Sequence, residues 1–162
     1  MTGDCRMRPR FDIVDCRDSL LTLRRVDGFA IESGVDERLI ALMGIRIAHI
    51  DGCESSIDFH VHKARMLGKA EPWLSMTSHR RRASIYNPVE RAVLEFTELL
   101  MQTANSISDE AYDAIRDFFM PKDIARLMVA VSAARMWDQL ALLAQSDPRS
   151  RNTDMAAARP QS

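Results

Sequence analysis

Apolar residues recur along most of this chain at the three- and four-residue spacing of amphipathic helices. The pattern predicts a helix from Arg17 to about Ser33, with Gly34 as its stop. The next segment, 36–50, is apolar on almost every face, which predicts a helix that is buried on most sides. Further helices are expected over 51–67 and 72–78, from Pro88 onward, from Ser108 onward and over about 122–145. Residues 1–14 predict an extended arm, because the alternation of Phe11 and Ile13 is too brief for a strand.

Local signals place several helix starts. Asn87-Pro88-Val89-Glu90 combines a capping residue, a proline at the first helical position and a glutamate at the third. Asp51 followed three residues later by Glu54 has the same spacing, so we expect Asp51 to cap the helix that follows. Arg46 stands alone in an apolar helix and should therefore have a carboxylate or carbonyl partner.

Length and composition favour one helical domain over 15–147, followed by a tail over 148–162. The formal net charge is −1, and the basic run 79–82 lacks interleaved aromatic residues, so no nucleic-acid partner is expected. No stretch of eighteen uncharged apolar residues occurs, and the first residues resemble no secretory signal, so no membrane span or export is expected. Three cysteines make no disulfide framework, which favours a reducing compartment, taken as the cytoplasm.

The most informative side chains lie on the helix predicted after Gly52. Cys53, Ser56 and His60 are spaced i, i+3 and i+7, which places a thiol, a hydroxyl and an imidazole on one helix face. A cysteine in a first helical turn is a candidate thiolate, because free amides and the helix dipole favour the charged form. His60 lies two turns from Cys53, too far to bond it directly, but within reach of Ser56 or of a bridging water. The alternative is that all three are core residues.

A metal site is the weaker interpretation of the same stretch. Potential ligands crowd it, namely His49, Asp51, Asp58, His60 and His62. His60 and His62 are two residues apart and therefore point to different helix faces, and no HExxH or clustered-cysteine pattern is present. We expect neither a metal nor another cofactor.

The segment "LIALMGIRIAHIDGCESSIDFHVHKARMLG" resembles the core of the alkylhydroperoxidase D (AhpD)-like proteins of the carboxymuconolactone decarboxylase superfamily. Arg46, Gly52, Cys53 and His60 match that core in register. The resemblance continues through "NPVERAVLEFTELL" and "IARLMVAVSAARMWDQLA" and covers about residues 11–145. It implies an all-α array of about six to seven helices and a homo-oligomer, most often a trimer or hexamer.

The resemblance also implies a peroxidase cycle that this chain cannot run in its usual form. In active AhpD-like proteins the second cysteine of a CxxC attacks peroxide, the first resolves it as a disulfide, and a glutamate and a histidine relay the proton. Here the second position is Ser56, the glutamate position is Ala41, and the family's glutamine is His49. A serine hydroxyl is too weak an acid to replace the reactive thiol and forms no disulfide.

Three functions therefore compete. The first is an antioxidant peroxidase or thiol oxidoreductase that acts through Cys53 alone, supported by Ser56 and His60, with a small peroxide and a thiol donor as partners. Cys16 or Cys5 could then resolve the oxidised thiol if the N-terminal arm reaches it. The second is a redox-silent relative that binds a small molecule in the former active-site pocket. The third is a non-redox enzyme with His49 and His60 as base and acid.

Overall fold

The chain is all-α throughout the residues that the computed structural model describes, which are 10–11, 13–75, 84–102 and 107–144. This confirms the expected fold class, with no strand in those ranges. A 3-10 turn, η1 (Ile13–Cys16), precedes seven α-helices: α1 (Arg17–Glu32), α2 (Glu37–Asp51), α3 (Glu54–Met66), α4 (Glu71–Ser75), α5 (Pro88–Gln102), α6 (Asp109–Arg116) and α7 (Pro121–Ala144). The expected arm was wrong at its end, because Ile13 and Val14 belong to η1 and are not extended. The predicted tail and residues 76–78 lie outside the described ranges.

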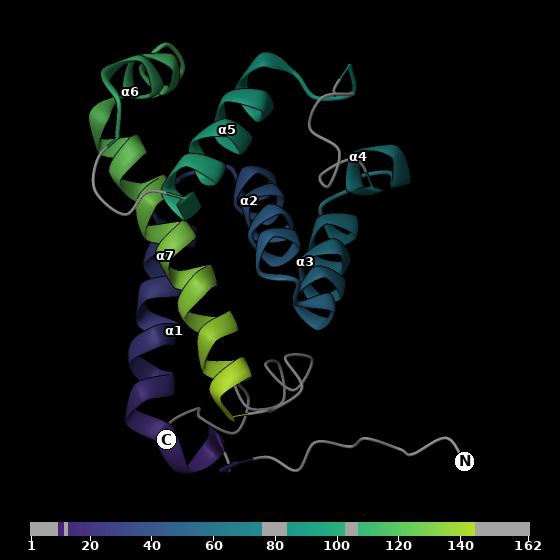
Figure 1. The fold of residues 1–162 in the computed structure, drawn as a ribbon, viewed down its shortest axis with the longest axis vertical. Helices are drawn as coiled ribbons and strands as arrows, with labels where there is room; N and C mark the ends of the chain where they lie inside the picture. Colours follow the sequence, from purple (N-terminus) through teal and green to yellow (C-terminus); the bar gives the residue numbers. More distant parts are fainter. Residues whose placement is uncertain (1–9, 12, 76–83, 103–106, 145–162) are drawn as a thin grey trace.

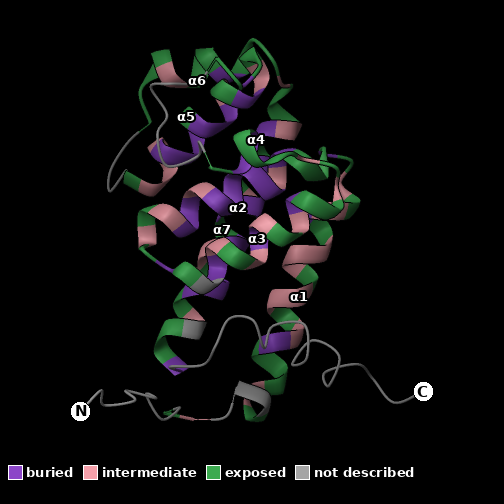
Figure 2. Cartoon of the chain, turned by 90° about the vertical axis from the view of Figure 1, so that its right-hand side faces the viewer, coloured by how far each residue is buried: buried purple, intermediate pink, exposed green. Residues whose placement is uncertain are grey.

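Helix α2 is the centre of the molecule. It lies against α3, α5 and α7, while α1 runs beside α7 on the outside (Figure 1). Figure 2 shows buried residues concentrated along α2 and the helices around it. Eight of its residues are buried: Leu39, Ala41, Leu42, Met43, Gly44, Ile45, Ile47 and Ala48. The expectation of a helix covered on most sides is confirmed, and its uniform apolarity follows from having neighbours on several faces.

The apolar core has two main parts that share α2. One face of α2 packs with α5, α6 and α7 around Met43, Val93 and Leu127. The other packs with α3, α4 and the start of α5 around Leu42, Ala64 and Trp73. A smaller cluster of Leu20 and Trp137 joins α1 to α7. Each part buries side chains that α2 could not cover alone, so the position of α2 is fixed from both sides.

A single glycine separates α2 from α3. Gly52 adopts the left-handed conformation with φ of 67°, which glycine accepts without strain. The backbone N–H of Cys53 then donates to the carbonyl of Ala48 at 2.9 Å and closes the end of α2. Cys53 itself is the N-cap of α3. The expected capping role of Asp51 was wrong, because Asp51 is the last residue of α2 and the chain reverses only after it.

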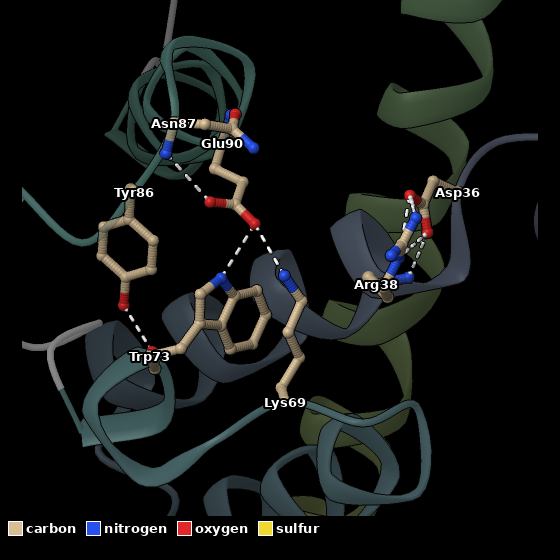
Figure 3. Close-up of polar contacts among 7 residues, drawn as sticks. All are labelled: Asp36, Arg38, Lys69, Trp73, Tyr86, Asn87 and Glu90. Carbon is tan, nitrogen blue, oxygen red and sulfur yellow. Dashed lines mark hydrogen bonds and ion pairs between the residues drawn. The ribbon is translucent and has the colours of Figure 1, made fainter.

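The predicted start of α5 is confirmed in detail (Figure 3). The Asn87 side chain accepts from the Glu90 N–H at 2.9 Å, and Glu90 accepts from the Asn87 N–H at 3.0 Å, which is a reciprocal capping box. Glu90 also accepts from Lys69 and from the indole of Trp73. Burial alone would raise the pKa of Glu90, but the bonds from Lys69, Trp73 and Asn87 outweigh it and lower the pKa. Burial, with the nearby Glu90 charge, raises the pKa of Tyr86 to about 12.

Helix α7 carries an exposed apolar stripe. Its exposed residues recur on one face and include Met128, Met136, Leu142 and Leu143. By length and composition α7 is the one helix in the described ranges that could cross a membrane, although buried core helices pass the same test. Its opposite face packs on α1 and α2 within the core, which is the behaviour of a core helix.

Candidate functional site

The start of α3 places the candidate thiol inside the protein. Cys53 is 7% exposed, and its backbone is held at both helix ends. As the N-cap of a thirteen-residue helix, it lies at the positive end of the α3 dipole. The geometry therefore has the feature that favours a thiolate, at a side chain that is almost fully buried.

Ser56 lies directly beside this thiol. The Cys53 thiol donates to Ser56 Oγ at 3.4 Å, as the i, i+3 spacing on α3 allows. Ser56 in turn donates to Asp138 Oδ1 on α7 at 2.6 Å. Both Ser56 and Asp138 have no exposed surface. We refer to Cys53, Ser56 and Asp138 together as the Cys–Ser–Asp chain, which joins the first turn of α3 to the C-terminal half of α7.

Asp138 is the member of the Cys–Ser–Asp chain to which sequence analysis gave no role. It follows buried Trp137 on α7 and is itself fully buried. A carboxylate on the buried side of a helix requires a donor, because an uncompensated buried charge is costly. That signal is present in the sequence, but the partner is 82 residues away and nothing local identifies it.

His60 is buried, and its place depends on a glycine of α2. A Cβ built on Gly44 would lie 2.3 Å from His60 Nδ1 and 2.4 Å from Cε1. The ring therefore sits directly against the α2 backbone, where only a glycine leaves space. The Phe59 ring also meets the imidazole edge-on, with ring centroids 5.1 Å apart. The imidazole is thus held in place by packing.

His49 occupies the last turn of α2, on a different helix from His60. It is half-buried, and its Nδ1 lies 2.8 Å from the carbonyl oxygen of Ile45, one turn earlier. That hydrogen bond fixes the ring against its own helix. A donating Nδ1 would leave Nε2 as the basic nitrogen. The pairing of His49 with His60 as base and acid stays a prediction.

Two further expectations concern the other cysteines and Arg46. Cys16 is half-buried at the junction of η1 and α1, and neither Cys16 nor Cys53 is in a disulfide, whereas Cys5 lies outside the described residues. The expected partner of Arg46 is confirmed, because its Nε donates to Glu98 at 2.9 Å. Within the described ranges, no group of three or more His, Cys, Asp or Glu side chains is placed to hold a metal ion.

Comparison with known proteins gives concordant results. Residues 18–99 match the sequence profile of the carboxymuconolactone decarboxylase family. The uncharacterized protein YdfG of Bacillus subtilis (strain 168) is 22% identical over 118 residues, which are 72% of this chain and 80% of YdfG. A crystal structure of a protein of unknown function from Agrobacterium tumefaciens, suggested to be the antioxidant defence protein AhpD, aligns with a TM-score of 0.80 and 26% identity. That alignment covers 86% of this chain and 97% of the other.

These matches agree with the core motif around Cys53 and with the arrangement of the helices. The profile spans half of the chain and includes α2, α3 and most of α5. The structural match extends the likeness to most of the remaining helices. The chain therefore belongs to the carboxymuconolactone decarboxylase family and has the all-α AhpD-like fold.

Proposed function

We propose that this protein is a thiol oxidoreductase that reduces a small peroxide through Cys53. The observation that carries the proposal is the position of the Cys53 thiol, at the N-terminus of α3 and hydrogen-bonded to Ser56. The thiolate would attack one peroxide oxygen, the O–O bond would break, and the leaving oxygen would take a proton to become an alcohol or water. Cys53 would be left as a sulfenic acid.

The second half of the cycle requires a thiol from outside the motif. Ser56 cannot form a disulfide with the oxidised Cys53, so an external low-molecular-weight or protein thiol would displace water from the sulfenic acid. A second equivalent of that thiol would release Cys53 as a thiol and leave with the first as a disulfide. Cys16 is a candidate for the first step only if η1 moves toward α3.

The test is the reactivity of Cys53 in the folded protein, with Cys16 and Cys5 as internal controls. We expect Cys53 to be alkylated at neutral pH faster than the other two, and a dimedone adduct to form at Cys53 after one equivalent of hydrogen peroxide. Peptide mass spectrometry measures both. A Cys53→Ala variant should lose peroxide consumption in the presence of a thiol donor. If Cys53 reacts only after unfolding, the proposal fails, and a redox-silent ligand-binding protein becomes the better explanation.

We also propose that the protein self-associates through the apolar stripe of α7. Met128, Met136 and Leu143 are exposed on one face of α7, with Ser132 and Gln139 among them. A group of large exposed apolar side chains on an outer helix face is typical of a surface that a second subunit covers. The family resemblance favours a trimer or hexamer. The reduced thiols of Cys16 and Cys53 fit a reducing compartment such as the cytoplasm.

Light scattering after size exclusion tests this assembly. We expect the wild-type protein to elute as an oligomer and Met136→Glu to shift it toward the monomer, because a charge in an apolar interface is left without a partner. The control is Glu95→Gln, which changes one charge at an exposed position of α5, away from the apolar residues of α7, and should leave the elution unchanged. A wild-type protein that is monomeric at every concentration contradicts the proposed self-association. If the protein elutes from the column only in detergent, the exposed apolar residues of α7 face a membrane and not a second subunit.

A further inference from the structure

The Cys–Ser–Asp chain has a direction, and that direction is fixed by Ser56. A serine hydroxyl carries one proton, which Ser56 donates to Asp138 Oδ1 at 2.6 Å. Its oxygen lone pairs are then left to accept, and the Cys53 thiol donates to them at 3.4 Å. The two hydrogen bonds therefore form one line of donors and acceptors, from the Cys53 thiol through the Ser56 hydroxyl to the Asp138 carboxylate.

From this line we infer that Asp138 accepts the proton of Cys53 through Ser56. The inference rests on the proposed function. In the transfer, the thiol proton passes to Ser56 Oγ as the Ser56 proton passes to Asp138 Oδ1. The S–H bond and the original Ser56 O–H bond break, a new Ser56 O–H bond and the Asp138 O–H bond form, and no proton is gained or lost. The products are a Cys53 thiolate, an intact serine hydroxyl and a neutral carboxylic acid.

Burial makes this route favourable over simple loss of the proton to water. Asp138 and Ser56 are fully buried and Cys53 nearly so, so each additional charge in the site is costly. Loss of the proton to solvent would leave two negative charges in one buried line. Transfer to Asp138 leaves the summed charge of these three side chains unchanged and moves the negative charge to the sulfur, which lies at the positive end of α3. The Ser56 hydroxyl then donates to the thiolate and stabilises it.

In this scheme Ser56 and Asp138 are positioning residues, and only Cys53 touches the peroxide. Ser56, which stands at the position of the family's second cysteine, therefore connects the Cys53 thiol to the Asp138 carboxylate on α7. The hydrogen bond from Ser56 also gives the buried carboxylate of Asp138 a donor.

The experiment compares the full-length protein with Asp138→Asn, which keeps an oxygen acceptor for Ser56 but cannot take a proton at neutral pH. We expect the Cys53 alkylation rate at neutral pH to fall about a hundredfold, at the low end of what a positioned acid–base group contributes. The ultraviolet absorbance of the thiolate, taken as the difference from a Cys53→Ala protein, should fall with it. Ser56→Ala should give the same two losses, and it serves as the second variant if Asp138→Asn does not fold. Cys16 alkylation and the circular dichroism spectrum should not change in either variant.

The outcomes separate the inference from the proposed function. If Cys53 is reactive in the wild type and equally reactive in both variants, the proton relay is wrong and the thiol function stands. If Asp138→Asn raises the thiolate absorbance, Asp138 acts on Cys53 as an opposing charge, and the inference is overturned. If Cys53 is inert in the wild type, the thiol function itself fails.

Discussion

Replacing Glu98 with glutamine is expected to destabilise the protein by about 3 kcal/mol, the lower end of the range for breaking a buried ion pair. Glu98 is 7% exposed and accepts from Arg46 Nε at 2.9 Å, between α5 and α2. Glutamine keeps the size and the oxygen acceptor but removes the negative charge that lies beside the Arg46 guanidinium. The lower end applies because the Arg46 side chain is 18% exposed and retains some contact with water. Denaturant unfolding, with the m-value held as a check on two-state behaviour, measures the change.

The matched control removes both charges together. Arg46→Met with Glu98→Leu replaces the pair by apolar side chains of similar length, which is often close to neutral. We therefore expect the double variant to be more stable than Glu98→Gln alone. A Glu98→Gln protein with wild-type stability would show that Arg46 finds sufficient hydration without Glu98.

Gly44→Ala is expected to destabilise the protein by about 2 kcal/mol, although alanine is the better helix former. In a helix interior the substitution alone would add about 1 kcal/mol of stability. The new Cβ would lie 2.3 to 2.7 Å from three atoms of the His60 ring, far inside contact distance. Relieving that overlap requires α3 to move or the ring to leave its position, and overpacking of this kind costs about 1–3 kcal/mol. The upper part of that range applies, because the ring is buried between two helices.

A double-mutant cycle identifies the ring as the cause. In a His60→Ala background the space is open, and Gly44→Ala should cost nothing or recover up to about 1 kcal/mol through helix propensity. Thermal and denaturant unfolding of the four proteins gives the coupling. If Gly44→Ala is equally destabilising with and without His60, the clash lies elsewhere in the contact between α2 and α3.

Local patterns determined most of the fold prediction. The helix starts at Pro88 and Ser108 and the stop at Gly34 depend on neighbouring residues only, and the structure places them as predicted. The error at Asp51 has a physical reason. The segment from Asp51 to Glu54 has a sequence that can begin one helix or end another. Which of the two occurs depends on whether the preceding helix continues as far as Gly52, and a capping pattern alone does not show this.

The candidate site was only partly predictable for a related reason. The proximity of Cys53 and Ser56 follows from helix periodicity, and the partner of Arg46 was expected in kind but not in identity. Asp138 could not be paired with Ser56, because that contact depends on how α7 lies across α3. Helix spacing placed His60 on the face of Cys53 and Ser56, but the space it occupies depends on the absence of a side chain at Gly44, which no polar motif marks.

The junction at Gly52 holds the backbone of Cys53 from both sides. The N–H of Cys53 makes the closing bond of α2, and its carbonyl accepts the first bond of α3 from the N–H of Ile57 at 3.0 Å. One residue thus terminates one helix and initiates the next. Any chemical change at Sγ that displaced this backbone would have to break a bond at one helix end or the other. A modification of Sγ that moved this backbone would therefore also change the relative orientation of α2 and α3.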